Sequence, residues 1–536
     1  MVLKGKEMNH NIITIIVKMK LIKVLVLIAL LATCAPNMVF AQPKPKRDVS
    51  KDRIGALNQA GIEKIEREST SKSGIHRKTK RRATKNKQHN RFSHQKQSNT
   101  KTEEQKYYEY SDSQGTIQAF EENGDTLQGE AQVQLGLCFY YGEGEPQDYN
   151  QAVYLFKKAA DHGNAEAQRY LGICYYDGTG VTQDYQQAVY WLKQSAEQGN
   201  IEAQFHLGLC YYDGTGVSRD YRRAIYWFTE AAVQGDDLAQ RLLALYYYKG
   251  QGVAQDYQQA FYWFAKLAEQ GDTDVQLILG ICYYHGQGVT QDYQQAAYWF
   301  KKAAEQGDVT AQYLLGLCYY DGTGVSRDYR QAIYWFTEAA EQGEVKAQTN
   351  LGFCYYSGQG VLQNYQQAVY WYKKAAEQGH VDAQACLGFC YHDGTGVSRD
   401  YQQAVYWLKK AADQGEANSQ AYLGLCYYNG DGVSKDYKQA VYWLKKAAEQ
   451  GIVGAQGWLG NCYFEGKGVS KDHKQAVYWY KLAAEQGEVG AQTNLGVCYY
   501  NGDGVSKDYN KAVYWLEKAA EQGVAQARDF LSRIGK

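Results

Sequence analysis

The stretch that decides the fold runs from Ala203 to Leu238 and reads AQFHLGLCYYDGTGVSRDYRRAIYWFTEAAVQGDDL. Its cysteine recurs every 36 residues along most of the chain. Counting each unit from the alanine that opens this pattern gives eleven units of 36 residues, from Ala131 to Gln526, without insertion or deletion. A fixed period in this range is typical of a solenoid, in which each unit packs mainly on its neighbours.

The first half of each unit predicts a helix that ends in a tight turn. Ala203, Leu207 and Cys210 are spaced i, i+4 and i+7, which places them on one apolar face at the helical period. Two closely spaced glycines, Gly214 and Gly216, then interrupt the helix. Small residues at several helical positions, including a mid-helix glycine, indicate that neighbouring backbones approach closely.

The second half of each unit predicts another helix. Ser218 has the residue type of an N-cap, and Asp220 then falls in the first turn, where the helix dipole favours negative charge. Gly235 is expected to end the helix as a C′ glycine. Tyr226 and Trp227 represent a recurring Tyr-Trp pair, which we interpret as packed core, with the tryptophan as the bulky partner of the small residues. The prediction is an all-α fold, an αα superhelical solenoid of eleven 36-residue helix-turn-helix repeats.

Charge is distributed unevenly along the 536 residues. The 58 basic and 58 acidic side chains balance overall, but residues 1–106 hold 24 Lys/Arg and 8 Asp/Glu, a net charge of +16. Residues 107–536 therefore hold 34 and 50, a net charge of −16. We expect the acidic part to repel nucleic acid, so the sequence predicts no specific nucleic-acid partner. The 50 tyrosines also exclude a largely disordered chain.

The N-terminal segment has the pattern of a secretory signal peptide over residues 1–41. Lysines precede an apolar run from Val24 to Ala32, and small residues precede a cleavage point after Ala41. Met19 is an alternative start, and acylation of Cys34 as a lipoprotein is an alternative to cleavage. The sequence thus predicts an exported protein, periplasmic, cell-surface or secreted, with no transmembrane span after signal removal.

The segments around the repeats have separate predicted roles. Residues 42–106 form a basic linker, expected to be disordered, in which residues 70–101 hold 11 Lys/Arg and no acidic residue. This linker is either a solvated spacer or an arm that contacts an anionic polymer or membrane surface. We expect an N-terminal capping segment at 107–130 and a C-terminal capping helix at 527–536, on either side of the repeats at 131–526.

Cysteine spacing argues against disulfides and metal sites. Equivalent residues of stacked helix pairs lie roughly 9–10 Å apart, beyond the ~7 Å between Cα atoms that a disulfide allows. We therefore predict free, buried cysteines in the repeats. No Cys/His group has zinc spacing, and the sequence predicts no catalytic residue, no cofactor and no metal.

The units share the pattern A-x-x-x-L-G-x-x-Y-x-x-G-x-G-V-x-x-D-x-x-x-A-x-x-W-x-x-x-A-A-x-x-G. This pattern, which covers residues 131–526, resembles the Sel-one-like repeat (SLR) family, a relative of the tetratricopeptide repeat. The resemblance implies a right-handed solenoid that acts as an adaptor or scaffold in protein complexes, and for exported bacterial members a contact with host or envelope proteins. Cysteine-rich secreted members carry two cysteines per repeat and resemble β-lactamases or penicillin-binding proteins. The second cysteine is absent here, which argues against that activity. An envelope hydrolase of the β-lactamase or penicillin-binding type is therefore the alternative function and not the leading one.

The positions that differ between units are the candidates for recognition. The third, seventh and eleventh positions of the first helices are spaced i, i+4 and i+8 on the face opposite the Ala-Leu-Cys stripe, and we expect them to line a concave groove together with the fourth position. An exposed Trp458 beside Asn461 is a candidate hot spot. The candidate partner-binding residues are Tyr170, His206, Tyr313, Asn350, Tyr422, Trp458, Asn461 and Asn494. The predicted function is that of an exported, non-enzymatic scaffold that binds a protein or peptide in this groove.

Overall fold

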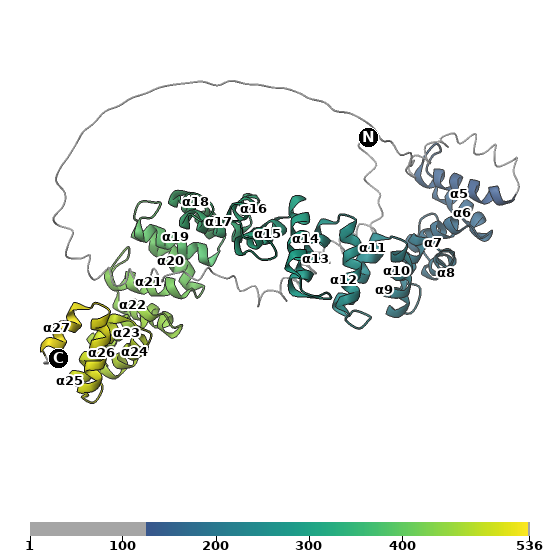
Figure 1. Ribbon diagram of the computed structural model, residues 1–536. Coiled ribbons are helices and arrows are strands. Elements are labelled where there is room, and N and C mark those ends of the chain that lie inside the picture. Colours follow the sequence, from purple (N-terminus) through teal and green to yellow (C-terminus); the bar gives the residue numbers. More distant parts are fainter. Residues whose placement is uncertain (1–124, 534–536) are drawn as a thin grey trace, which may run out of the picture. The chain divides into compact units, whose positions relative to one another are not determined.

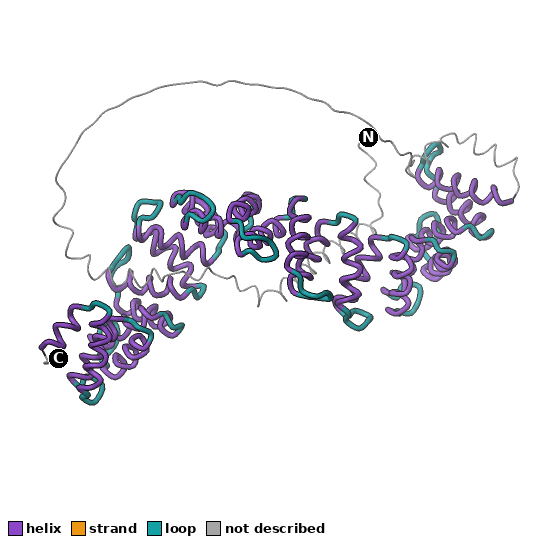
Figure 2. Tube along the Cα trace, viewed as in Figure 1, coloured by secondary structure: helices purple, strands orange, loops and turns teal. Residues whose placement is uncertain are grey.

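The computed structural model describes residues 125–533. The predicted signal peptide, its Cys34 alternative, the basic linker at 42–106 and residues 107–124 lie outside this range. The described residues form helices joined by turns and contain no strand (Figures 1 and 2). This confirms the predicted all-α class.

The described residues contain 23 helices. They are α5 (Asp125–Tyr141), α6 (Tyr149–Asp161), α7 (Ala165–Asp177), α8 (Tyr185–Glu197), α9 (Ile201–Asp213), α10 (Tyr221–Val233), α11 (Asp237–Lys249), α12 (Tyr257–Glu269), α13 (Thr273–His285), α14 (Tyr293–Glu305), α15 (Val309–Asp321), α16 (Tyr329–Glu341), α17 (Val345–Ser357), α18 (Tyr365–Glu377), α19 (Val381–Asp393), α20 (Tyr401–Asp413), α21 (Ala417–Asn429), α22 (Tyr437–Glu449), α23 (Val453–Glu465), α24 (His473–Glu485), α25 (Val489–Asn501), α26 (Tyr509–Glu521) and α27 (Ala525–Arg533).

The described chain divides into two compact units. The first contains residues 125–275 and 286–290, and the second contains residues 276–285 and 291–533. Helices α5 to α12 belong to the first unit and α14 to α27 to the second, while α13 is divided between them. Within each unit, consecutive helices pack against one another, from α5 to α12 in the first unit and from α14 to α27 in the second. Each unit is therefore a solenoid of consecutive helix pairs, as the period predicts.

Acidic and amide side chains cap most of the helices, and α19 and α23, which follow His380 and Ile452, lack a side-chain cap. Asn200 is the N-cap of α9, and Asp220 is the N-cap of α10, where its carboxylate accepts hydrogen bonds from the backbone N–H groups of Arg222 and Arg223. The prediction that Ser218 caps this helix is wrong, because α10 begins at Tyr221 and Ser218 lies two residues before the cap. The carboxylate is the group that reaches the free amides, and its charge also suits the positive end of the helix dipole.

The predicted breaks between helices are confirmed at glycines with left-handed backbones. Gly214 has φ +77° and is the C-cap of α9. Gly216 has φ +72°, and a Cβ atom placed on it would lie 2.1 Å from the carbonyl oxygen of Tyr185 in the preceding repeat. Gly235, with φ +102°, follows α10 and faces open space. A glycine at position 216 thus allows both the left-handed backbone and the close stacking of one repeat on the next.

The mid-helix glycines lie against large side chains of the second helices. A Cβ atom on Gly208 would lie 2.6 Å from Cε1 of Phe228, and one on Gly316 would lie 2.6 Å from Cδ1 of Phe336. The expectation that the tryptophan fills this place is wrong, because the side chain in contact belongs to the residue after Trp227. One step along a helix turns the side chain by about 100°, which is enough to exchange the two roles.

The second-helix tryptophans join successive repeats. Trp443 is 5% exposed and belongs to a core cluster with Val405 and Leu408 of the preceding second helix. Trp479 packs in the same way with Val441 and Leu444. Each tryptophan therefore extends the core of one repeat into the next, which is how a solenoid without a central core gains stability.

A glutamine pair satisfies buried polar groups in nine of the eleven repeats. The side chain of Gln204 is buried, donates to the carbonyl oxygen of Ala196 (3.1 Å) and accepts from Nε2 of Gln234 (2.8 Å). Gln420 makes the same contacts with Ala412 (3.1 Å) and Gln450 (2.8 Å) in the second unit. Buried amides need such partners, which explains why both glutamines recur along the chain.

The eleven cysteines of the described residues are free thiols, as predicted. Nine are buried, and Cys138 and Cys386 are partly buried. Burial raises the pKa of the Cys174 and Cys354 thiols to about 12. They are thus uncharged at neutral pH and pack as small apolar groups.

Candidate functional site

Several third-position side chains of the first helices are buried. Tyr313 and Phe205 are each 5% exposed, and Arg169 is 7% exposed. The prediction that this position lines an open groove is wrong for these three residues. One of them, Tyr313, is among the candidate partner-binding residues. They lie against neighbouring elements, and Arg169 reaches Glu202 of the following first helix.

Tyr170 lies in an aromatic and ionic cluster of the first unit. Its ring stacks on Phe156, with centroids 5.1 Å apart and an interplanar angle of 15°. The guanidinium of Arg169 lies 3.9 Å from the Tyr170 ring centroid and forms ion pairs with Glu166 (2.9 Å) and Glu202. These contacts hold the partly exposed Tyr170 ring in one position.

His206 occupies the same position in the following repeat. Its ring meets Phe205 edge to face, with centroids 5.8 Å apart. Burial, together with the positive charge of Arg169, lowers the pKa of His206 to about 4. The imidazole is therefore neutral at pH 7 and can both donate and accept a hydrogen bond.

Tyr313 and Asn350 are brought together in the second unit. Nδ2 of Asn350 lies 3.5 Å from the Tyr313 hydroxyl, a long hydrogen bond between α15 and α17. Burial raises the pKa of Tyr313, so its hydroxyl stays protonated.

Tyr422 lies apart from the Tyr313–Asn350 pair. Its ring centroid lies 4.7 Å from that of Phe389 and 5.7 Å from that of His392, and both contacts are edge to face.

Trp458 is partly buried, not fully exposed as expected. Its ring packs edge to face on Tyr428 of the preceding repeat, with centroids 5.1 Å apart. The ammonium of Lys467 donates to the Tyr428 hydroxyl (3.0 Å), and it also pairs with Glu465. Trp458 thus lies at the edge of a core cluster, with part of the indole open to solvent.

Asn461 links three helices. Its Oδ1 accepts hydrogen bonds from the Tyr480 hydroxyl (2.7 Å) and from Nδ2 of Asn494 (3.0 Å). The structure therefore brings Asn461 and Asn494 together from successive repeats. Trp458 shares α23 with Asn461 and contacts the repeat on the other side.

A row of exposed tyrosines on the second helices is the feature that sequence reasoning missed. Tyr226 and Tyr406 are 55% and 49% exposed, and each ring meets the following tryptophan edge to face. The prediction that both members of the Tyr-Trp pair are core is wrong for the tyrosine. Adjacent helical residues point about 100° apart, so only one of the two can face the core. A large aromatic residue repeated beside a buried one was the available signal.

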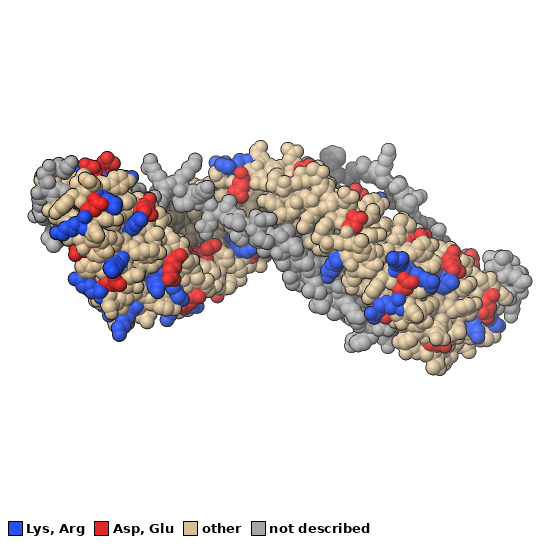
Figure 3. All heavy atoms as spheres, turned by 90° about the horizontal axis from the view of Figure 1, so that it is seen from below, with Lys and Arg blue, Asp and Glu red and all other residues tan. Residues whose placement is uncertain are grey.

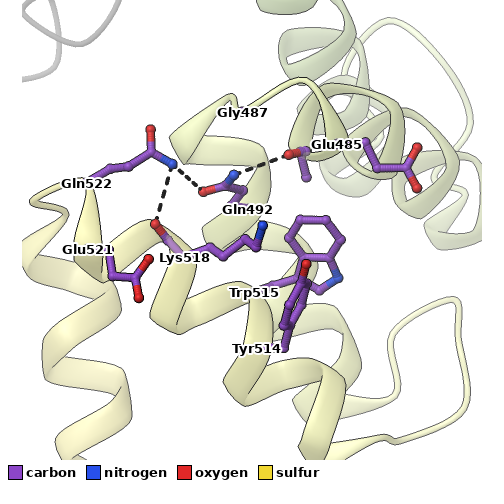
Figure 4. A pocket seen from close by; sticks show the side chains of 9 residues that line it. Glu485, Gly487, Gln492, Tyr514, Trp515, Lys518, Glu521 and Gln522 are labelled. Atoms are coloured by element: carbon purple, nitrogen blue, oxygen red, sulfur yellow. Dashed lines mark hydrogen bonds between the residues drawn. The ribbon is translucent and has the colours of Figure 1, made fainter.

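A pocket lies between α24, α25 and α26 at the last complete repeat (Figure 4). Tyr514 and Trp515 line one side, and the Lys518 side chain runs beside them, with its ammonium 5.1 Å from the Tyr514 ring centroid. Gln522 donates to Gln492 (2.9 Å) at the other side. Aromatic, cationic and amide groups thus converge on one site between these three helices.

The charges on the visible face are mixed: lysine and arginine side chains lie interspersed with aspartate and glutamate (Figure 3). Within residues 125–533, no group of three or more His, Cys, Asp or Glu side chains is arranged to hold a metal ion. No helix among these residues has the length and apolar character needed to cross a membrane.

The helix pairs and their constant period define an all-α solenoid of the repeat-protein class. The Sel1 repeat family model matches eleven consecutive segments of 36 residues, from residues 129–164 to residues 489–524. The chain therefore belongs to the Sel1 repeat family. Solenoids of this family typically act as protein-interaction scaffolds and are generally non-catalytic.

Two solved structures are similar to this chain, and the first of them supports this assignment. A protective antigen of uropathogenic Escherichia coli strains, which displays an SLR fold, is 38% identical, with a TM-score of 0.64 over 79% of this chain and 91% of that chain. A Sel1 repeat protein from Oxalobacter formigenes is 34% identical, with a TM-score of 0.46 over 57% of this chain and 88% of that chain. No curated protein sequence matches the chain.

Proposed function

We propose that this protein is an exported, non-enzymatic scaffold that binds a protein or peptide along the first-helix face of its repeats. The binding residues are those that vary between repeats while keeping exposed surface. They are Tyr170, His206, Asn350, Tyr422, Trp458, Asn461 and Asn494, with the buried Tyr313 supporting Asn350.

The observation that carries the proposal is the contrast between two sets of positions. The alanine, leucine, glycine and cysteine positions of the first helices are nearly identical in every repeat and are buried from the second repeat onward. The fourth position varies: it carries tyrosine, histidine, asparagine or tryptophan in six repeats, where it is partly exposed, and glutamine, leucine, isoleucine or cysteine in the other five. In a solenoid, core positions repeat while surface positions can be specialised for a partner.

Two aromatic side chains on this face have the properties of binding anchors. Tyr422 and Trp458 are held by edge-to-face contacts with Phe389 and Tyr428, so little side-chain entropy is lost when a partner covers them. Tyrosine and tryptophan are also enriched among interface hot spots. Asn461 and Asn494 supply amide groups suited to hydrogen bonds with a peptide backbone.

Export is part of the proposal because of the signal-peptide pattern in residues 1–41. The Escherichia coli relative is a protective antigen, which fits a protein that meets host molecules. Fractionation of cells that express the full chain tests this part, since the proposal expects the protein outside the cytoplasm. Recovery only in the cytoplasm would reject it.

The binding face is tested by chemical cross-linking in intact cells, followed by affinity capture of the full chain. The proposal expects Tyr422→Ala and Trp458→Ala each to reduce the yield of the specific cross-linked species. Tyr478→Ala is the matched control, because it removes an equally aromatic, exposed side chain from the second-helix surface. Equal loss in the control would show that the partner binds elsewhere.

A further inference from the structure

Three consecutive repeats of the second unit carry the same cluster of one exposed tyrosine, one buried tryptophan and one exposed lysine. The tyrosines are Tyr370, Tyr406 and Tyr442, with exposed fractions of 48%, 49% and 49%. Each lies edge to face on the buried tryptophan that follows it, with centroids 4.9–5.0 Å apart. The tyrosine rings are thus rigid and open to solvent at equivalent places on α18, α20 and α22.

A lysine four residues after each tyrosine lies over both rings. The ammonium groups of Lys374, Lys410 and Lys446 lie 4.7–4.8 Å from the tyrosine centroids and 5.0–5.2 Å from the tryptophan centroids. Cation–π contacts of this kind fix the direction of a side chain that otherwise moves freely in solvent. The three cations are therefore held in place, one per repeat.

The neighbouring lysines behave differently. Lys373 pairs with Glu377 and Lys445 pairs with Glu449, each at 3.9 Å. Within the described part of the chain, no carboxylate forms an ion pair with Lys374, Lys410 or Lys446. Helices α18 and α22 thus each present one neutralised lysine and one lysine whose charge is free to meet an external anion, and Lys410 is the matching free lysine of α20.

We propose that Lys374, Lys410 and Lys446, with Tyr370, Tyr406 and Tyr442, form a binding surface for an acidic polysaccharide. The apolar face of a sugar ring packs on an exposed tyrosine, and a uronic-acid carboxylate pairs with the free ammonium. The adjoining carboxylates and glutamine amides can exchange hydrogen bonds with sugar hydroxyls. This surface lies on the second helices and is separate from the first-helix face assigned to the protein partner.

The repetition of the cluster favours a polymer of repeating chemistry over a peptide. The same three residue types recur at intervals of 36 residues, so each of these three consecutive repeats offers the same subsite. A peptide of unique sequence would be matched by different side chains in successive repeats. A polysaccharide presents the same group again and again, and several weak subsites then add through avidity.

The charge balance favours a sparsely charged polymer over nucleic acid. Residues 347–454, which form the three repeats, hold 9 Lys/Arg and 9 Asp/Glu, a net charge of zero. Nucleic acid carries a phosphate on every nucleotide, so several phosphates would meet the carboxylates beside each free lysine. A uronic-acid polymer with neutral sugars between its carboxylates avoids this repulsion.

The test uses the full chain, immobilised hyaluronan oligosaccharides and two triple variants. Lys374→Gln/Lys410→Gln/Lys446→Gln should weaken binding about tenfold, because it removes the free cations. Lys373→Gln/Lys409→Gln/Lys445→Gln removes the same charge from the same helices one residue away, and should change affinity less than about threefold. Tyr370→Ala/Tyr406→Ala/Tyr442→Ala should also lose affinity, with unchanged helical circular dichroism.

Competitors identify the class of ligand. Soluble hyaluronan should displace the protein, while neutral dextran, oligothymidylate and polyglutamate of similar length should not. Equal loss in the two lysine variants, or no binding by the unmodified chain, overturns the proposal. It is also overturned if the Lys374 triple variant loses oligothymidylate or polyglutamate binding instead, since the surface would then serve nucleic acid or acidic peptide. Cross-linking through Tyr422 and Trp458 should be unaffected, so this test is independent of the proposed scaffold function.

Discussion

The ring of Phe228 occupies the space that a side chain on Gly208 would need, because a Cβ atom there would lie 2.6 Å from Phe228 Cε1. The same contact is made by a phenylalanine, tyrosine or leucine in the other repeats that keep this glycine. The fourth repeat carries Ala244 in its place, together with Tyr246 where the others have cysteine. The distance between the two helices of a repeat is therefore set by a small residue on one helix and a large one on the other.

Substitution of Gly216 tests the stacking of repeats. Gly216→Ala should lower the free energy of unfolding by about 1–2 kcal/mol for the left-handed backbone and by a further 1–3 kcal/mol, roughly, for the clash with the Tyr185 carbonyl. Gly235 also has a left-handed backbone but is surrounded by open space, so Gly235→Ala should lower the free energy of unfolding only by the backbone contribution of about 1–2 kcal/mol. Urea unfolding followed by circular dichroism measures both. Equal losses would show that the Tyr185 contact relaxes without cost.

The capping assignment leads to a second matched pair. Asp220→Ala should cost about 1 kcal/mol, because the amides of Arg222 and Arg223 lose their acceptor. Ser218→Ala should change stability by less than about 0.5 kcal/mol. Thermal unfolding of the two variants decides between them. A larger loss for Ser218→Ala would restore the serine as the cap.

His206 should make the folded chain sensitive to acid. Its folded-state pKa of about 4 lies below the ordinary value near 6.5. As the pH falls from about 6.5 toward 4, His206 is protonated in the unfolded chain but stays neutral in the folded chain. Its contribution to the free energy of unfolding is therefore fully present above this range and is lost within it. His206→Gln should remove this part of the pH dependence of the melting temperature. An NMR titration that places the His206 pKa at or above its ordinary value would contradict the account.

Thiol reactivity tests the packing of the cysteines. Denatured, unreduced protein should titrate with eleven thiols from the repeats, since all of the described cysteines are free. In the native state the nine buried thiols should react slowly, because burial excludes the reagent and raises the thiol pKa. The partly buried Cys138 and Cys386 should react first. Fewer than eleven thiols under denaturing conditions would reveal disulfides.

The sequence was sufficient for the fold because its period is constant. The spacing of Ala203, Leu207 and Cys210 predicted the first helix, and the two turn glycines predicted its end. Spacing alone did not separate neighbours on a helix: it assigned Tyr226 to the core and Trp227 to the contact that Phe228 makes. In both cases the predicted direction of the side chain around the helix is wrong by about 100°, the angle between adjacent residues. Which of two adjacent side chains faces the neighbouring helix depends on how the helices cross and not on their period.

The candidate site was predictable only in part for a related reason. Variation between repeats identified Trp458 and Asn461, but the sequence did not reveal that Tyr313 turns inward to meet Asn350. Variable positions include both surface residues and residues that fit one repeat to the next. Only the packing of adjacent first helices separates the two groups.

The most direct test of the account compares Trp458→Ala with Trp443→Ala by melting temperature and by cross-linked capture of the partner. Trp458→Ala should weaken partner binding by roughly 2 kcal/mol or more and, because the ring is only partly buried, should reduce stability much less than Trp443→Ala. Trp443→Ala removes a side chain that is 5% exposed and should cost about 3–5 kcal/mol of stability. If Trp458→Ala lowers the melting temperature as far as Trp443→Ala and leaves partner capture unchanged, then Trp458 is core and the first-helix face is not the binding surface.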